Sequence, residues 1–96
     1  MRVSYNALVQ KDVNRILKRY DSVSAGLGDE FWSELMSQIA ATAQNPGRSH
    51  PTDNDFHRVN LKRFPYHFLF RLLPDRMRIT VVRHHKRHPG FGTKRR

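Results

Sequence analysis

The sequence predicts an α+β domain in which an N-terminal helical hairpin packs on one face of a small antiparallel β-sheet. Two amphipathic helical patterns fill about residues 6–45, and three alternating strand patterns follow within about residues 56–85. Each helix has one apolar stripe, and the strands share one strongly apolar face, so burial is satisfied when the hairpin covers that face. A chain of 96 residues has room for one such domain, spanning 1–96.

The helical hairpin is predicted by apolar spacing and by its stop signals. Asn6 can cap the first helix, and "DSVSAGLG" breaks the pattern with Ser and Gly. Asp29 and Glu30 fall in the first turn of the second helix, where the helix dipole favours carboxylates. "NPG" at 45–47 ends it, because proline cannot continue a helix. The apolar stripe of the first helix comprises Val9, Val13, Ile16, Leu17 and Tyr20.

The second half reads as a β-meander of three strands, because the apolar period changes to two. Residues 1–5 could add a short strand, and residues 90–96 read as a mobile basic tail. The helix-facing side is expected to carry Val59, Leu61, Tyr66, Phe68, Phe70, Leu72, Met77, Ile79 and Val81. The open face is expected to carry Arg58, Asn60, Lys62, His67, Leu69, Arg71, Arg78, Thr80, Val82 and His84.

Charge is concentrated in the strand region. The whole chain carries +10 with histidine neutral. Residues 1–55 hold six basic and seven acidic residues, a net −1, whereas residues 56–96 hold twelve basic residues and Asp75, a net +11. Such a segment repels itself unless an anionic partner covers it, and phosphate backbones, an acidic protein or anionic lipid would each serve.

Several classes of protein are disfavoured. The chain has no cysteine, which excludes disulfides and thiolate zinc sites and agrees with a reducing cytoplasm. It contains neither a signal-peptide pattern nor an apolar run of membrane-helix length, so we expect a cytoplasmic protein without membrane contact. No motif indicates a cofactor. A metal site is disfavoured at the histidines, because the surrounding arginines and lysines would repel a cation.

The order of the motifs resembles the RelE/ParE superfamily of bacterial toxins, the basic halves of type II toxin–antitoxin pairs, often called plasmid stabilisation proteins. The resemblance covers about residues 4–89 and rests on "GLGDEF", "NPG", "LKRFPYHFLFRL" and "RITVVRHHKRHP". It implies a helical hairpin on an antiparallel sheet. It also implies a cognate antitoxin, small and acidic or amphipathic, encoded beside the toxin and wrapped over its active surface.

The resemblance leaves two targets open. RelE-like members cut mRNA on the ribosome, and ParE-like members poison DNA gyrase. "GLGDEF" and "FPY" are more ParE-like, whereas "RHHKR" resembles the Arg-Tyr-His run of some RNA-cleaving members, with Arg83 and His85 at the matching positions. The favoured interpretation is a ribosome-dependent, metal-independent endoribonuclease (an mRNA interferase). A gyrase inhibitor without hydrolysis, or a non-catalytic nucleic-acid-binding domain, is the alternative.

The stretch "VVRHHKRHP" supplies the candidate site. RNA cleavage requires a base for the ribose 2′-hydroxyl, an acid for the leaving oxygen and cations for the transition state. Histidine suits both proton roles. Strict alternation puts His67 and His84 on one open face and His85 on the other, and a bulge near Arg83 would re-aim His85. The candidate catalytic residues are His67, Arg83, His84 and His85, and the candidate nucleic-acid-binding residues are Lys62, Arg63, Arg71, Lys86 and Arg87.

Overall fold

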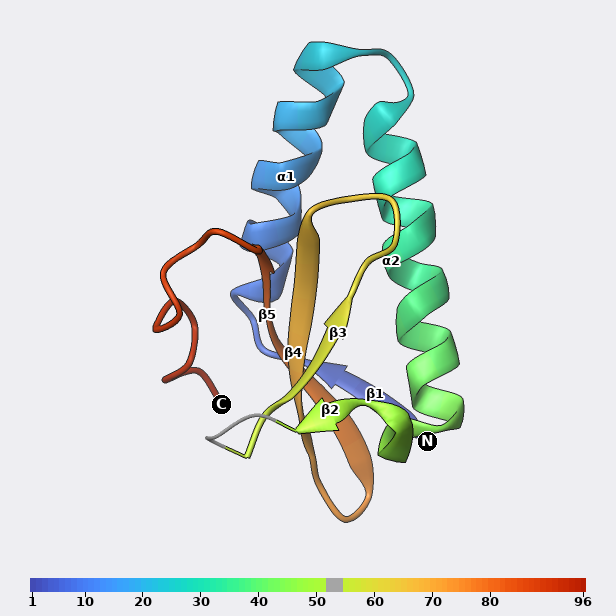
Figure 1. Cartoon of the computed structure of the whole chain (residues 1–96), viewed down its shortest axis with the longest axis vertical. Helices are drawn as coiled ribbons and strands as arrows, with labels where there is room; N and C mark the ends of the chain where they lie inside the picture. Colours follow the sequence, from blue (N-terminus) through green and yellow to red (C-terminus); the bar gives the residue numbers. More distant parts are fainter. Residues whose placement is uncertain (52–54) are drawn as a thin grey trace.

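The structure is a computed structural model that describes residues 1–51 and 55–96. Two antiparallel helices cover one side of a five-stranded sheet of order β1-β5-β4-β3-β2 (Figure 1). The helices and strands are β1 (Arg2–Tyr5), α1 (Val9–Val23), α2 (Leu27–Gln44), a 3-10 turn (Pro46–Arg48), β2 (His50–Pro51), β3 (His57–Asn60), β4 (Tyr66–Leu72) and β5 (Arg76–His84). The predicted α+β class is confirmed, and neither helix is both long and apolar enough to cross a membrane.

The sheet is mixed rather than wholly antiparallel. The predicted meander corresponds to β3, β4 and β5, which pair antiparallel. The N-terminal strand β1 adds to the free edge of β5 in parallel, from Arg2 opposite Arg76 to Tyr5 opposite Ile79. A two-residue strand, β2, pairs with β3 and was not predicted. Because β1 ends at Tyr5, the edge of β5 beyond Ile79 is left to other partners.

The hairpin forms close to its sequence signals, but Asn6 is not the cap of the first helix, because α1 begins at Val9 and its N-cap is Leu8, without a side-chain cap. Asn6 accepts a hydrogen bond from the Leu8 backbone N–H through Oδ1 (2.9 Å), just before α1. The helix-joining turn needs its glycines for two different reasons. Gly26 has φ 84°, a left-handed conformation that suits glycine. Gly28 lies so close to Asp21 that a Cβ atom would meet its carboxylate, which would have to shift. The Asp21 carboxylate instead accepts the Gly28 N–H (3.2 Å).

The main core lies between the hairpin and the sheet. Phe31 from α2 is fully buried and forms edge contacts with Phe64 and Tyr66, with ring centroids 5.3 and 5.4 Å apart. Aromatic side chains bury large apolar areas, so this group contributes strongly to the stability of the core. The other buried members of this core are Val9, Val13, Ile16, Leu35, Ile39, Leu61, Phe68, Phe70, Met77, Ile79 and Val82.

A β-bulge in β5 corrects the predicted assignment of residues to the two faces. Leu69 pairs with Val81 and Phe70 pairs with Ile79, so Thr80 is an extra residue without a partner on β4. From this point the alternation of β5 shifts by one position. Val82, expected on the open face, joins the main core, and Val81, expected on the helix-facing side, joins Phe56 and Leu69 in a second cluster.

The C-terminal segment packs against the second cluster. Phe91 contacts the cluster of Phe56, Leu69 and Val81, on the face of the sheet away from the hairpin. Arg95 donates to both carboxylate oxygens of Asp12 on α1 (2.6 and 3.1 Å). Sequence reasoning expects residues 90–96 to form a mobile tail and gives no signal for these contacts. Figure 1 shows this segment folded back beside β5.

Candidate functional site: a cationic edge at the end of β5

Two histidines and two arginines meet at the end of β5, and we call His67, His85, Arg58 and Arg83 the imidazole cluster. The rings of His67 and His85 stack with an interplanar angle of 8° and centroids 5.2 Å apart. Their Nδ1 atoms are 2.9 Å apart, which requires one ring to donate to the other. Arg83 Nε lies 2.9 Å from His67 Nε2, and an Arg58 nitrogen lies 3.3 Å from His85 Nδ1.

These contacts fix the direction of the hydrogen bonds. Arginine can only donate, so Nε2 of His67 accepts from Arg83. Neutral His67 then carries its proton on Nδ1 and donates it to Nδ1 of His85. Neutral His85 therefore carries its own proton on Nε2. The chain runs Arg83 to His67 to His85, and the lone pair of His85 is already occupied.

Burial and positive charge keep both rings neutral. His67 has only 1% of its surface exposed. Burial, followed by the cations Arg58 and Arg83, lowers the pKa of His67 to about 3. His85 is more exposed, but partial burial and the charge of Arg58 also lower its pKa. Burial, followed by the cation of Arg58, lowers the pKa of Arg83 from its ordinary high value. Both imidazoles in the cluster are therefore neutral, and each donates through one ring nitrogen.

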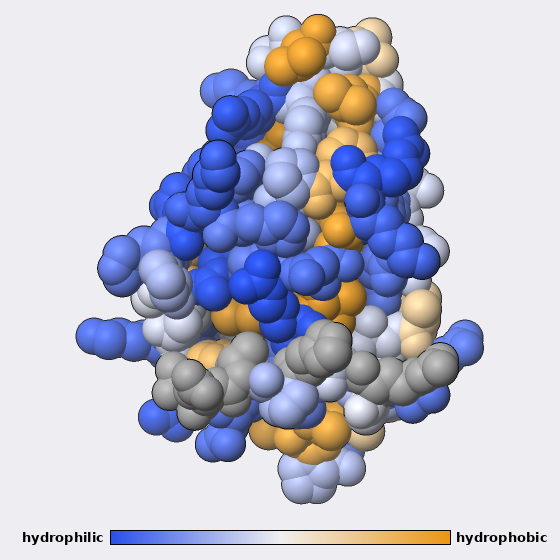
Figure 2. All heavy atoms as spheres, viewed as in Figure 1, coloured by the Kyte–Doolittle hydropathy of each residue, from blue (hydrophilic) through white to orange (hydrophobic). Residues whose placement is uncertain are grey.

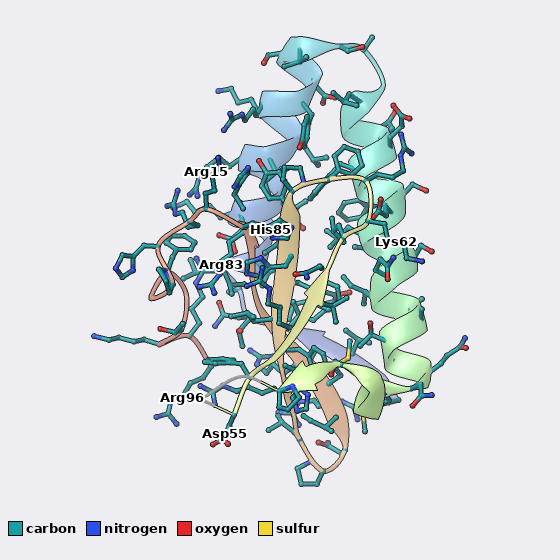
Figure 3. The ribbon with its side chains drawn as sticks, viewed as in Figure 1. Arg15, Asp55, Lys62, Arg83, His85 and Arg96 are labelled. Carbon is teal, nitrogen blue, oxygen red and sulfur yellow. The ribbon has the colours of Figure 1, made fainter. Side chains whose placement is uncertain are left out.

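Arg83 also holds the C-terminal segment. Its Nη1 donates to the carbonyl oxygens of Pro89 and Phe91, both at 2.8 Å. Together with the bond to His67, the guanidinium therefore makes three hydrogen bonds within the protein. Figure 3 shows Arg83 and His85 together at the end of β5.

His84 lies on the other side of the strand, which corrects the predicted pairing of His67 and His84 on one face. His84 pairs with Tyr66 across the ladder and contacts its ring edge-on at 5.0 Å, whereas His67 pairs with Arg83. The bulge at Thr80 causes this exchange, three residues before the position where sequence reasoning allowed for one. His85, not His84, is therefore the histidine that faces His67.

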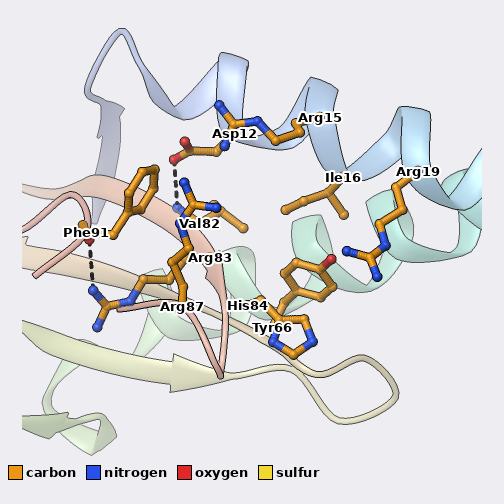
Figure 4. Close-up of a pocket in the computed structure, with 10 residues that line it drawn as sticks. All are labelled: Asp12, Arg15, Ile16, Arg19, Tyr66, Val82, Arg83, His84, Arg87 and Phe91. Carbon is orange, nitrogen blue, oxygen red and sulfur yellow. Dashed lines mark hydrogen bonds between the residues drawn. The ribbon is translucent and has the colours of Figure 1, made fainter. Parts of the chain in front are cut away.

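On the His84 side, α1 and the end of β5 enclose a cationic cavity of about 100 Å³, which we call the arginine pocket (Figure 4). Arg15 and Arg19 extend into it from α1, Arg87 comes from the turn after β5, and Tyr66 and His84 form its base. Its remaining lining residues are Asp12, Ile16, Val82, Arg83 and Phe91.

Asp12 is the carboxylate of this pocket, and it is fully engaged. Its side chain is only 2% exposed. Besides binding Arg95, it accepts the backbone N–H of Val82 (3.1 Å). Since β1 stops before this point, Asp12 takes the place of a strand partner at the edge of β5.

The predicted nucleic-acid-binding residues are spread over three places. Lys86 and Arg87 follow β5, and the Arg87 guanidinium lies 4.0 Å from the centre of the Phe91 ring. Lys62 and Arg63 lie in the β3–β4 turn beside α2, where the Glu34 carboxylate accepts both backbone N–H groups (Figure 3). Arg71 covers the ring of Phe56 at 4.3 Å, in the second cluster. The structure therefore brings Lys86 and Arg87 to the site and leaves the other three elsewhere.

Sequence reasoning missed several members of this edge. Arg58 was placed on the open face, as the structure confirms, but was not proposed for the site. Arg15 and Arg19 could have been found, because residues four apart share one face of a helix. Phe91 and Arg95 gave no local signal. Among the described residues, no group of three or more histidine and carboxylate side chains is placed to hold a metal ion.

An apolar groove lies along the hairpin on the side of β1. It has a volume of about 310 Å³, and Trp32, 42% exposed, and Tyr5, 44% exposed, stand at its rim. Met36, Leu35 and Val13 contribute to its walls.

In Figure 2, which views the sheet side, hydrophilic side chains cover most of the visible face, with apolar atoms in a band between the helices.

The fold is the RelE/ParE-like α+β fold, a helical hairpin packed on a small sheet. A chain from the chromosomal ParDE TA system of P. aeruginosa has a TM-score of 0.77 to this protein at 16% sequence identity. The match covers 88% of this chain and 95% of that chain. At this identity the likeness shows a shared fold. No protein-family model and no curated protein matches the sequence.

Proposed function

We propose that this protein is the toxin of a type II toxin–antitoxin pair. The observation that carries the proposal is the fold shared, over nearly the whole of both chains, with a chain of a ParDE toxin–antitoxin system. Two surface features support it. The apolar groove leaves Trp32 and Tyr5 exposed, and the end of β5 concentrates positive charge. A small partner with an apolar helix and acidic side chains is complementary to both.

The geometry favours a toxin that acts by docking on its target. A general base needs a free lone pair, and that of His85 accepts from His67 and Arg58. A general acid needs a proton that it can release near neutral pH, and neutral His85 holds its Nε2 proton too tightly. His67 is buried and cannot reach a substrate. A ParE-like action on DNA gyrase, with the cationic edge as the docking surface, agrees best with this arrangement.

Ribosome-dependent mRNA cleavage is the second candidate, and one observation favours it. His85 is exposed beside the Arg58 and Arg83 cations, as a site that stabilises a developing phosphorane charge requires. A turn of the His85 ring during substrate binding would free a lone pair. The exposed His85 beside two cations is thus the feature that supports mRNA cleavage, the interpretation that the sequence favours.

Induction of the protein in cells, with and without the gene encoded beside it, tests the toxin proposal. We expect growth arrest when the protein is induced alone and its relief when the neighbour is co-expressed and co-purifies. Strong expression without slower growth, and no binding by the neighbour, would contradict a toxin.

Two observations distinguish the two possible targets: which cellular process fails first after induction, and the effect of His85→Ala. Docking on gyrase predicts supercoiling defects and DNA damage, with growth arrest changed little by His85→Ala. Cleavage predicts mRNA cut at codons. In an assay with purified ribosomes, His85→Ala should then lower the rate at which the protein cuts mRNA by about 10²–10⁴-fold. The matched control is His88→Ala, three residues further along and outside the imidazole cluster.

A further inference from the structure

The arginine pocket gathers cations from separate elements. Arg15 and Arg19 lie one turn apart on the same face of α1, and Arg87 approaches from the turn after β5. His84 and the Tyr66 ring close the base of the cavity. Figure 4 shows α1 along one side and the end of β5 along the other. Folding thus lines one cavity with arginine side chains from α1 and from the turn after β5.

The pocket lacks an internal counter-ion. In residues 1–51 and 55–96, the ion pairs are Arg63–Glu30, Arg76–Asp75 and Arg95–Asp12, and none includes Arg15, Arg19 or Arg87. Asp12 lines the pocket, but its oxygens already accept from Arg95 and from the Val82 N–H. Like charges held close together destabilise a fold unless an anion neutralises them. The arrangement is that of a site for an external anion.

Size and geometry identify the kind of anion. A cavity of about 100 Å³ is roughly three times the share of liquid volume of one water molecule. It is well below the roughly 300–1,000 Å³ of pockets that enclose a whole organic ligand. The donors approach from α1 on one side and from the β5 turn on the other, which suits a tetrahedral group better than a planar one. Guanidinium groups also match phosphate oxygens in pairs.

We propose that the arginine pocket binds a single phosphate group, with Arg15, Arg19 and Arg87 as its ligands. The pocket borders the imidazole cluster, because Arg83 also lines it, but the proposed ligands Arg15, Arg19 and Arg87 are not members of that cluster. A toxin that docks on gyrase, a ribonuclease and a passive binding domain could each carry it. The phosphate comes either from a nucleic-acid backbone or from a small phosphomonoester.

The test is a titration of the full chain with inorganic phosphate at constant ionic strength, followed by the NMR signals of the arginine Nε–H groups. We expect saturable shifts at Arg15, Arg19 and Arg87. Arg19→Ala should weaken binding about tenfold or more, the usual worth of one hydrogen bond between charged groups. Lys18→Ala is the matched control, since it removes the same charge from the neighbouring exposed position on α1, outside the pocket. It should change binding less than about twofold.

Further ligands separate the sources and the alternatives. A nucleoside 5′-monophosphate that competes with inorganic phosphate identifies a phosphomonoester site. A dinucleoside monophosphate, which has only a diester, identifies a backbone site. Acetate that binds as tightly as phosphate would overturn the proposal and indicate a site for an acidic protein side chain. Equal losses in Arg19→Ala and Lys18→Ala, or shifts that never saturate, would also overturn it, because both indicate diffuse attraction of anions. Each of these failures leaves the toxin proposal untouched.

Discussion

The imidazole cluster and the arginine pocket adjoin each other at the same strand end and share Arg83, yet their other charges are used differently. In the imidazole cluster, Arg83 donates to one imidazole and two backbone carbonyls. In the arginine pocket, Arg15 and Arg19 have no carboxylate partner among the described residues. A cation with internal acceptors supports the fold, whereas a cation without them is available to a ligand. Counting charges along the sequence cannot separate these two roles.

The bulge at Thr80 creates the two sides. Without the extra residue, His84 would share a face with His67, as strict alternation predicts. With it, Arg83 and His85 face His67, while His84 faces Tyr66 and α1. One irregular residue therefore decides which histidine joins which group of arginines.

The largest effect is expected at Asp12, the buried carboxylate that lines the arginine pocket. Asp12→Ala leaves the Arg95 guanidinium and the Val82 N–H without their shared partner. Breaking a buried ion pair from one side costs about 3–5 kcal/mol. Urea unfolding at neutral pH should show a loss of this size.

The control is Asp75→Ala, which removes a pair with Arg76 that is largely exposed. Such pairs contribute about 0–1 kcal/mol. If the two variants lose similar stability, Asp12 does not anchor α1 and the C-terminal segment to β5.

Removing one arginine from each region tests whether the imidazole cluster supports the fold while the arginine pocket does not. Arg83→Leu loses three hydrogen bonds and should cost about 1.5–3 kcal/mol. Arg15→Leu should change stability by less than about 0.5 kcal/mol, or raise it slightly by relieving repulsion. Hydrogen exchange at residues 89–95 should quicken only in Arg83→Leu. Equal losses in both variants would show that the arginine pocket is also a structural element.

The imidazole cluster should also make stability depend on pH. The pKa of His67 is about 3 in the folded protein, against about 6.5 for an unfolded histidine. Between these values the unfolded state binds the extra proton, so stability is fully present above about pH 6.5 and falls as the pH drops towards 3. The slope from this residue approaches about 1.4 kcal/mol per pH unit.

His67→Gln isolates that slope, because glutamine can accept from Arg83 and donate to His85 without titrating. Urea unfolding from pH 7 to pH 4.5 should show a shallower decline in the variant than in the natural protein. Parallel declines would mean that His67 takes up its proton without unfolding, and the neutral chain from Arg83 to His85 would be wrong.

Local patterns in the sequence were sufficient for the two helices and the three-stranded antiparallel part of the sheet. Apolar spacing and the stop signals at Gly26 and "NPG" predict both helices, and alternation predicts β3, β4 and β5. These features depend on neighbouring residues. The short strand β2 and the contacts of Phe91 and Arg95 depend on partners far along the chain, so no local pattern reveals them.

Part of the candidate site's composition was predicted from the sequence, and its geometry was missed. His67, Arg83 and His85 do meet, as the site prediction requires, but His84 lies on the other side. Alternation is a strict rule only in a regular strand, and "RITVV" contains no glycine to indicate a bulge. The burial of His67 and the nearby charges of Arg58 and Arg83, which together lower its pKa, depend on residues distant in sequence and cannot be read from its neighbours.

A smaller effect, of opposite sign, is expected at the bulge in β5. Thr80 is fully buried, and in the part of the chain that the structure describes no donor or acceptor reaches its Oγ1 atom. A buried hydroxyl without a partner is unfavourable, so Thr80→Val should raise the free energy of unfolding by about 1 kcal/mol while keeping the branched shape. Thr42→Val is the matched control, since Thr42 Oγ1 donates to the Gln38 carbonyl (2.7 Å) and its loss should lower stability by about 0.5–1.5 kcal/mol. If urea unfolding gives changes of opposite sign for the two variants, the unpaired hydroxyl of Thr80 destabilises the protein. If Thr80→Val destabilises as Thr42→Val does, the hydroxyl helps to form the bulge, and with it the separation of His84 from His85.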